Sequence, residues 1–373
     1  MIYLLILVIS VYVFLMIFLW MGFKKTPKSN ENSSVEKLSF SIVVPFRNEA
    51  ENLPILLKSI EKLNYPIENF EVILVDDESM DGFRVASLAS LCSASPRVGF
   101  RVLTVENVRK SNSPKKDAIQ TAILHSKFDW IITTDADCLV PENWLLDLNN
   151  YIQNTKKQMV SGPVFFKNKS NFLNDFQQIE MISLQAVTIG SFDFNFAFMC
   201  NGANFAYSKN FFQQLNGFDG NEKIASGDDV FLLQKAVKNF PDEVGFLLKQ
   251  DFQIITNQAE NWSELFQQRV RWAGKSKAYS SGFGKFVALT VLLANLAFIT
   301  SLILLFFGVF EMIVLLLLKV ISDLLLANQT AQFYKIKMKN SLLTALVYPF
   351  FSSAVAFYSL FGKYEWKGRS FKS

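Results

Sequence analysis

Four long apolar runs constrain the fold of this chain more than any other feature. The first, Ile2 to Phe23, carries no charge and has the length of about 20 residues that a helix needs to cross a bilayer. Three further runs, at 286–308, 309–327 and 342–362, lie near the other end. They explain why 50% of the 373 residues are hydrophobic, which is too apolar for an ordinary soluble enzyme. We therefore expect an integral membrane protein with an N-terminal anchor (1–23) and a C-terminal membrane region (286–362).

The charges beside these runs indicate their orientation. Lys24, Lys25 and Lys28 follow the first run, whereas a cleaved signal peptide has its positive charges in front and a small-residue cleavage site behind. The first run therefore predicts an uncleaved anchor, and the positive-inside rule places the segment after it in the cytosol. The loop at 331–340 and the tail at 363–373 are also rich in lysine and favour the same side.

These charges conflict with a simple count of crossings. Three full C-terminal crossings would leave the basic tail outside the cell. Because Pro349 interrupts the last run and a proline can break a helix, we expect this segment to be re-entrant or a broken helix. Lys319 and Asp323 lie four residues apart in the preceding run, so they should share one helical face and pair or face protein.

The segment at 39–281 has ordinary polarity, and the shorter segment at 24–38 before it predicts a linker. At roughly 240 residues, the longer segment is large enough for one α/β domain with a proper core. Four short β-rich runs alternate in it with stretches of helical periodicity, at 40–46, 71–75, 100–105 and 130–134. This alternation predicts a mostly parallel sheet with helices on both faces, and a ligand site beyond the carboxyl ends of its strands.

Rare residue types exclude several kinds of chemistry. A single histidine, His125, leaves almost no room for a hydrolase that uses a histidine base. Three cysteines, Cys92, Cys138 and Cys200, lack the spacing of a zinc site or a disulfide framework. The net charge of +4 gathers beside the apolar runs, so membrane lipids rather than nucleic acid are the expected partner. Acid and base chemistry must therefore use carboxylates.

Acidic side chains follow three of the predicted strands. Glu49 comes after the first strand, Asp76 and Asp77 end the second, and Asp135 and Asp137 follow the fourth. In a parallel sheet these ends meet at one edge. The last two acids are one residue apart, so both can face one ligand, and a cation with its own anion is the obvious candidate. Each acid alone could instead cap a helix, but three clusters together make capping a poor explanation.

Six motifs follow one another along residues 39–280. In chain order they are "IVVPFRNEAENL", "VDDESMDG", "DAD", "NGANFAYSKNFFQQLNGFD", "SGDDVFLLQKA" and "QQRVRWAG". This ordered series resembles the membrane-bound family 2 glycosyltransferases, whose GT-A fold is an α/β domain that binds nucleotide sugars. Six motifs in the family's order are far more specific than any one of them.

The resemblance implies a divalent cation and a nucleotide-sugar donor, with UDP as the expected nucleotide. Asp137, oriented with Asp135, would hold Mg²⁺ or Mn²⁺ where the diphosphate leaves, since these hard cations prefer oxygen ligands. The residues expected to bind the donor are Pro45, Glu49, Asp76, Asp77, Lys115, Lys116 and Asp135. Which of the adjacent aspartates at 76 and 77 contacts the base stays open.

One stretch departs from the family pattern. Family members often carry a glycine-lysine pair before the helix that follows the third strand, whereas here the stretch is "NSPKKDAIQTAI". Pro114 precedes Lys115 and Lys116, so either lysine can be the one that reaches phosphate.

Two later motifs are expected to supply the general base and further contacts to the substrates. By position in the motif, Asp229 is the candidate general base, and its neighbour Asp228 either raises the pKa of Asp229 or caps the helix that follows. Gln268, Arg271 and Trp272 fall within about one helical turn and can meet one ligand. Arg271 can bind diphosphate and Trp272 can offer a face to a sugar ring. The alternative is a basic interfacial helix with no catalytic role.

The sequence therefore predicts an inverting, metal-dependent glycosyltransferase with its catalytic domain in the cytosol. A base-activated hydroxyl would displace the nucleoside diphosphate directly. The acceptor is either a membrane lipid that is glycosylated once or a growing polysaccharide, and the few apolar runs favour the lipid. A non-catalytic membrane partner of a polysaccharide export system is a further alternative, against which the intact acidic residues argue.

Overall fold

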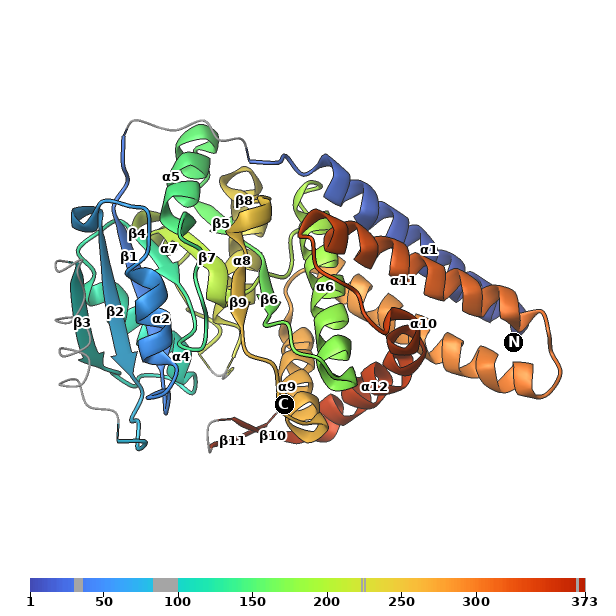
Figure 1. Ribbon diagram of the computed structural model, residues 1–373. Coiled ribbons are helices and arrows are strands. Elements are labelled where there is room, and N and C mark those ends of the chain that lie inside the picture. Colours follow the sequence, from blue (N-terminus) through green and yellow to red (C-terminus); the bar gives the residue numbers. More distant parts are fainter. Residues whose placement is uncertain (30–35, 83–99, 223, 225, 367–368, 373) are drawn as a thin grey trace. The chain divides into compact units, whose positions relative to one another are not determined.

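The structure is a computed structural model that describes residues 1–29, 36–82, 100–222, 224, 226–366 and 369–372 (Figure 1). It forms two compact units. The sheet unit consists of Pro27–Phe165 and Met199–Asn257, and the membrane-helix unit consists of Met1–Thr26, Phe166–Phe198 and Gln258–Ser373. Cys92 and residues 30–35 of the predicted linker lie outside the described residues.

The sheet unit is built on a seven-stranded sheet with the order β3-β2-β1-β4-β7-β5-β8. The first four strands in this order are parallel, β7 is antiparallel to both β4 and β5, and β5 is parallel to β8. The elements of this unit are β1 (Phe40–Phe46), α2 (Leu53–Ile60), β2 (Phe70–Asp76), β3 (Arg101–Glu106), α4 (Pro114–His125), β4 (Trp130–Thr133), α5 (Trp144–Thr155), β5 (Met159–Ser161), β7 (Phe205–Ser208), α7 (Lys209–Gln214), α8 (Asp228–Asn239) and β8 (Val244–Phe246). A two-stranded sheet joins β6 (Val164–Phe166) to β9 (Ile254–Thr256). The predicted α/β fold with a mostly parallel sheet is confirmed.

Continuous apolar strands explain why the sheet forms where the sequence predicts it. Ile42 and Val44 of β1 and Val72 of β2 are fully buried, and they pack in one core with Leu53 and Leu56 of α2. Buried parallel strands of this kind need cover on both faces, and helix α4 packs against β1 and β2 as well (Figure 1).

The register brings the ends of the parallel strands to one edge. Phe46 lies beside Asp76, and Asp76 lies beside Glu106, so β1, β2 and β3 end together. Thr133 at the end of β4 pairs with Val43 of β1. The loops that carry the predicted acids therefore leave the sheet at the same edge.

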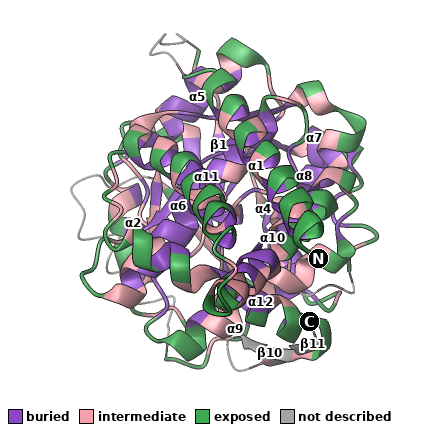
Figure 2. Ribbon diagram, turned by 90° about the vertical axis from the view of Figure 1, so that its right-hand side faces the viewer, coloured by how far each residue is buried: buried purple, intermediate pink, exposed green. Residues whose placement is uncertain are grey.

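The membrane-helix unit contains four helices that are long and apolar enough to cross a membrane by length and composition. These are α1 (Ile2–Lys25), α10 (Gly282–Phe306), α11 (Met312–Phe333) and α12 (Ser341–Phe361). Much of their surface is exposed (Figure 2). Many of the exposed side chains are apolar, for example Leu289, Leu317 and Leu325, as expected of surfaces that face lipid. The unit also contains α6 (Phe172–Phe192), α9 (Trp262–Gly274) and the hairpin of β10 (Lys363–Trp366) and β11 (Arg369–Lys372).

The division into units differs from the predicted boundaries, because α6 and α9 group with the apolar helices. Both helices lie within the segment at 39–281 that the sequence predicts to be one domain. In the structure α6 packs against α1 and α11, and α9 packs against α12. The contacts of these two helices, rather than their position between β-rich segments, decide to which unit they belong.

Inside the bundle, Lys319 and Asp323 pair as predicted. Lys319 Nζ lies 2.7 Å from Asp323 Oδ2, and the lysine side chain is only 1% exposed. The hydroxyl of Tyr12 from α1 donates a hydrogen bond to the same carboxylate. A charge in this position is expensive unless it is paired. The ion pair lies within α11, and the hydrogen bond from Tyr12 ties α1 to α11.

Helix α12 does not break at Pro349. It continues through this proline as one helix of 21 residues, in contrast to the expected broken segment. Both of its ends touch segments next to the start of other helices. Asn340 at its start donates to Asp175 in the first turn of α6 at 2.7 Å, and Leu360 near its end accepts from Lys277, which precedes α10, at 3.1 Å.

The α1–α6 contact needs glycine on both sides. A Cβ on Gly22 would lie 2.0 Å from the backbone oxygen of Gly190, and a Cβ on Gly190 would lie 2.3 Å from the oxygen of Leu19. Since both neighbouring atoms belong to the backbone, the helices themselves would have to separate.

We predict that Gly22→Ala lowers the free energy of unfolding by about 1–3 kcal/mol, the usual range for overpacking. Thermal unfolding of the purified protein in detergent measures the change. Gly282→Ala is the control, because nothing lies within 4 Å of its Cβ position and its helix should lose no stability. Equal melting temperatures for the two variants would contradict the prediction.

Candidate active site

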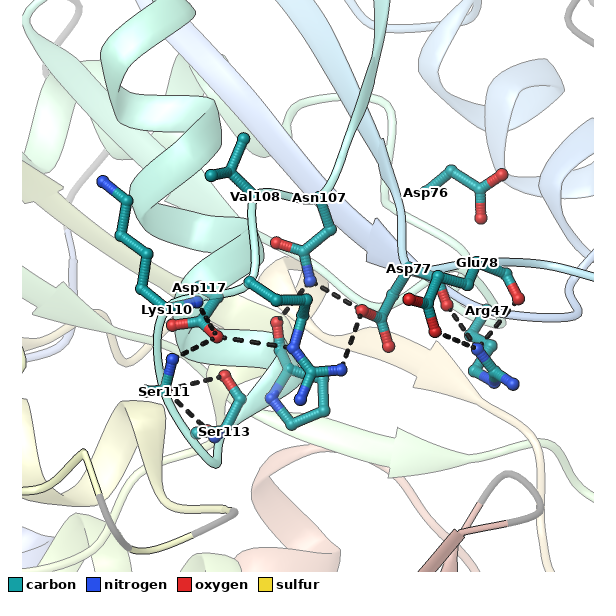
Figure 3. Close-up of polar contacts among 12 residues, drawn as sticks. Arg47, Asp76, Asp77, Glu78, Asn107, Val108, Lys110, Ser111, Ser113 and Asp117 are labelled. Carbon is teal, nitrogen blue, oxygen red and sulfur yellow. Dashed lines mark hydrogen bonds and ion pairs between the residues drawn. The ribbon is translucent and has the colours of Figure 1, made fainter.

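Arg47 ties together the loops that follow β1 and β2 (Figure 3). Its Nη1 donates to the backbone oxygens of Asp77 at 2.6 Å and of Glu78 at 2.8 Å. In the same direction, the backbone N–H of Ala50 donates a hydrogen bond to Asp81 Oδ2 at 2.8 Å. These contacts hold the two loops side by side at the edge of the sheet.

The adjacent carboxylates at the end of β2 have different surroundings. Asp77 is buried and accepts a hydrogen bond from Asn107 Nδ2 at 2.7 Å, with Arg109 Nη1 3.5 Å away. Asp76 is half-buried, and its Oδ1 accepts the backbone N–H of Ser79 at 2.9 Å. Figure 3 shows Asp77 turned toward Asn107, whereas Asp76 points away from it. Asp76 is therefore the more accessible of the two to a ligand.

The loop after β3 adds residues that none of the six motifs includes. Asn107 and Arg109 contact Asp77, and Arg109 Nε also lies 3.5 Å from Asp117. Asp117 is 1% exposed, and its Oδ2 accepts the backbone N–H groups of Lys110 and Ser111, so it shapes this loop (Figure 3). The signal was present in the sequence, since this loop follows a third parallel strand that ends at the same edge.

The two lysines of α4 point to different partners. Lys115 Nζ lies 2.6 Å from Asp135 Oδ1. Lys116 is 1% exposed, and its Nζ donates to the backbone oxygens of Asn221 at 2.7 Å and Ile224 at 2.9 Å. Lys116 therefore holds a loop in place, and Lys115 is the lysine that lies at the carboxylates.

Lys115 links the end of β4 to the start of α8. Besides Asp135, its Nζ lies 3.7 Å from Asp228 Oδ2. Burial alone would lower the pKa of Lys115, but Asp135, Asp228 and Asp229 outweigh the burial and raise the pKa well above its ordinary value. The ammonium stays charged and offsets the repulsion between carboxylates from two distant segments of the chain.

Asp137 is strongly affected by its neighbours. Burial and, after it, the nearby carboxylates of Asp135 and Glu49 raise the pKa of Asp137 to about 6. Thr256 opposes the shift, because its hydroxyl donates to Asp137 Oδ2 at 3.0 Å. Mutual repulsion of this kind is relieved when a cation binds.

These residues are suited to a divalent cation that the donor helps to hold. Among the residues that the structure describes, no group of three or more His, Cys, Asp or Glu side chains could hold a metal ion by itself. Asp135 and Asp137 could supply only part of a set of oxygen ligands. Mg²⁺ sites are commonly built from one or two carboxylates and substrate phosphates, so an incomplete set is the expected arrangement.

The first turn of α8 carries the two carboxylates of the "GDD" stretch. Gly227, with a positive φ of 84°, is the N-cap residue, so Asp228 is the first residue of the helix rather than its cap. Asp228 is buried, whereas Asp229 is half-buried. Asp229 Oδ2 accepts the backbone N–H of Gly202 at 2.9 Å, which fixes its orientation.

The residues of the last motif lie together on α9 in the membrane-helix unit. Gln268, Arg271 and Trp272 are all half-buried, and the two residues between them, Arg269 and Val270, are buried. Pro45, the remaining residue expected at the donor site, is half-buried in β1 beside Val75 of β2.

The sequence matches two models of known protein families. Residues 41–216 match the family model described as glycosyl transferase family 2, and residues 130–358 match the one described as glycosyl transferase family group 2. The probable glycosyltransferase YdaM of Bacillus subtilis (strain 168) is 25% identical over 266 residues, which cover 68% of this chain and 59% of that protein. The undecaprenyl-phosphate 4-deoxy-4-formamido-L-arabinose transferase of Edwardsiella ictaluri is 36% identical over 102 residues, which cover 27% of this chain and 30% of that protein. The chain thus spans less than two thirds of these curated relatives.

A solved structure shares the fold. The mannosyltransferase from Pyrobaculum calidifontis, in complex with GDP-Man and Mn²⁺, superposes with a TM-score of 0.59 at 16% identity, over 94% of this chain and 99% of the other. Together with the order of strands, this likeness confirms the expected GT-A-like α/β fold.

Proposed function

Because the chain belongs to the family 2 glycosyltransferases, we propose that it transfers a sugar from a nucleotide sugar to a membrane lipid, with inversion at the anomeric carbon. The convergence of carboxylates and Lys115 at one edge of the sheet carries this proposal. Lys115 Nζ lies 2.6 Å from Asp135 and 3.7 Å from Asp228, although these acids come from segments about 90 residues apart.

The donor would bind across the loops that follow β1, β2 and β4. Asp76, the more accessible acid at the end of β2, is suited to accept hydrogen bonds from the base or ribose, while Asn107 and Arg109 hold Asp77. We propose UDP as the nucleotide. Since the Pyrobaculum mannosyltransferase was solved with GDP-Man, GDP-sugars belong in the same assay.

Asp135 and Asp137 would hold Mg²⁺ or Mn²⁺ together with the diphosphate of the donor. Such a cation neutralises the negative charge that develops on a leaving diphosphate. Lys115 contributes a second positive charge at Asp135 that the protein itself supplies.

Asp229 is proposed as the general base. Its half-buried carboxylate takes the proton of the acceptor hydroxyl, the acceptor oxygen forms a bond to the anomeric carbon, and the bond from that carbon to the phosphate oxygen breaks. The nucleoside diphosphate leaves with the electron pair. A single displacement inverts the anomeric centre. Asp228 is buried 3.7 Å from Lys115, which suits it to hold the lysine rather than to move a proton.

A lipid acceptor is supported by two observations. The chain carries apolar helices that are long enough to cross a membrane. Over a limited part of its length, it resembles proteins named for transfer involving undecaprenyl phosphate. A processive polysaccharide synthase would make a product of many sugars, so the size of the product separates the two.

The first test is transfer by the purified protein. With UDP- and GDP-sugars, Mg²⁺ or Mn²⁺ and membrane lipid, mass spectrometry should find a lipid that carries one added sugar.

Asp137→Ala should abolish transfer and donor-dependent metal binding without unfolding the protein, because the residue lies at a strand end. Normal turnover by this variant, in chelator as well as in metal, would refute the metal site.

The second test concerns the base. Asp229→Asn keeps the shape and one of the two oxygens that accept backbone N–H groups of Gly202 and Val230, but it cannot take a proton. We expect turnover to fall by about 10²–10⁴-fold, the usual contribution of a general base, while donor affinity changes by less than a few fold. Titration calorimetry and initial rates measure the two quantities. A loss of donor affinity with unchanged turnover at saturation would make Asp229 a donor ligand instead.

We further propose that the sheet unit lies in the cytosol and that α12 keeps both of its ends on that side. Its start contacts Asp175 of α6 and its end contacts Lys277, which precedes α10, so both ends lie next to segments joined directly to the sheet unit or to α9. This arrangement also leaves the basic loop at 331–340 and the basic tail at 363–373 inside.

Cysteine labelling in intact cells tests the orientation. A cysteine at Phe310, in the exposed turn between α10 and α11, should react with a membrane-impermeant thiol reagent. Cysteines at Lys337 and Ser373 should react only after the cells are opened, and the parent protein controls for the native thiols. Labelling at Ser373 from outside would mean that α12 crosses the membrane.

A further inference from the structure

Arg269, inside the Q-x-x-R-W stretch of α9, has a buried partner that no motif identifies. Arg269 and Glu180 of α6 form an ion pair in which Arg269 Nε lies 2.8 Å from Glu180 Oε2. Their side chains are 4% and 6% exposed, although they are 89 residues apart in sequence. A pair this buried must recover a large desolvation penalty, so its geometry has to be good.

Arg269 in turn contacts two of the three motif residues. Its Nη1 donates a hydrogen bond to Gln268 Oε1. Its guanidinium carbon lies 4.1 Å from the centroid of the Trp272 ring, which is a stacking distance for a cation on an indole. One guanidinium therefore joins the Glu180 carboxylate to the amide of Gln268 and to the indole of Trp272, which is expected to lie near the acceptor.

Helix α6 also fixes the segment that leads into α9. Gln177, one turn before Glu180, is fully buried and donates to the backbone oxygen of Ala259 at 3.0 Å while it accepts the N–H of Ala259 at 2.9 Å. One turn earlier, the backbone oxygen of Asn174 accepts from Gln258 Nε2 at 3.0 Å. Three successive turns of α6 therefore set the position of α9.

The opposite contact is apolar. Val270 is fully buried against Val355 of α12, and Phe266 packs beside Phe351 and Tyr358 of the same helix. Because α9 is held by α6 and by α12, a rotation that would move the motif side chains is opposed on two sides.

We propose that Glu180 is a positioning residue for acceptor binding, which acts by fixing Arg269 and through it Gln268 and Trp272. The inference rests on the proposed transfer to a lipid acceptor. Glu180 contacts Arg269 and is not itself expected to touch donor, acceptor or the reacting atoms. Its loss should therefore affect the acceptor step and leave donor binding in the sheet unit unchanged.

Glu180→Gln removes the charge and keeps the shape. A displacement of about 1 Å in a group that positions substrate can lower the rate by about 10²-fold, so we expect kcat/KM for the lipid acceptor to fall by up to that factor. Donor affinity and hydrolysis of the donor without acceptor should stay within about twofold of the parent, because the side chains that Glu180 and Arg269 position are not those proposed to bind the donor. A purely structural role would lower all of these activities together.

Arg269→Lys provides a second variant if Glu180→Gln folds poorly. Lysine can still pair with Glu180 but cannot also bond Gln268 and stack on Trp272, because its ammonium lacks the planar fork of a guanidinium. We expect a folded protein with the same selective loss. Asp323→Asn is the matched control: it breaks the Lys319–Asp323 pair in the same unit without touching α9, so it should lower stability and spare the acceptor kcat/KM.

A measurement independent of activity keeps the inference testable. Subtracting the fluorescence of Trp272→Phe from that of the parent gives the emission of this indole. The emission should shift in Glu180→Gln and Arg269→Lys and stay unchanged in Asp323→Asn. Unchanged emission and unchanged acceptor kinetics in both variants would overturn the inference, as would an equal loss of donor hydrolysis and transfer. If the parent transfers no sugar from any donor, the proposed function fails, while the emission still reports whether Glu180 positions α9.

Discussion

A positive charge between carboxylates is the condition on which the candidate active site depends. Asp135 at the end of β4 and Asp228 at the start of α8 would repel each other at close range, and partial burial strengthens that repulsion. Lys115 lies between them and offsets it. Asp137 is different, since burial and its carboxylate neighbours raise its pKa to about 6. Lys115 thus offsets the charge of Asp135 and Asp228, whereas the charge around Asp137 is suited to a cation that arrives with the substrate.

The sequence could predict this edge because its cause is local. Strands β1, β2 and β4 are largely apolar runs, and the chain leaves each of them at its carboxyl end. Parallel pairing brings those ends together whatever covers the sheet. Lys115 and Lys116 show where local reasoning stops. Neighbouring residues of a helix point about 100° apart, so only the docking of α4 on the sheet decides which lysine reaches Asp135. Nor could spacing reveal that Gly227, rather than Asp228, is the N-cap of α8.

The place of α6 could not be predicted for a related reason. Its buried face includes Gln177 and Glu180, and polar residues inside a unit can be recognised as buried only when their partners are known. The partners, Ala259 and Arg269, lie more than 80 residues further along the chain. At Pro349 the sequence predicts a break that the structure does not have. A proline inside a helix removes one backbone hydrogen bond, but the bundle around α12 keeps the helix continuous, so a local breaker need not end the element.

The Q-x-x-R-W spacing has a physical reason in this protein. With 3.6 residues per turn, Gln268 comes back beside Arg271 and Trp272, while the two residues between them turn toward the interior. There Arg269 meets α6 and Val270 meets α12, so the same five residues both carry the motif and anchor it. The anchors belong to the membrane-helix unit. The proposed acceptor contact is therefore positioned by other helices of the membrane-helix unit, whereas loops of the sheet unit position the residues proposed to bind the donor.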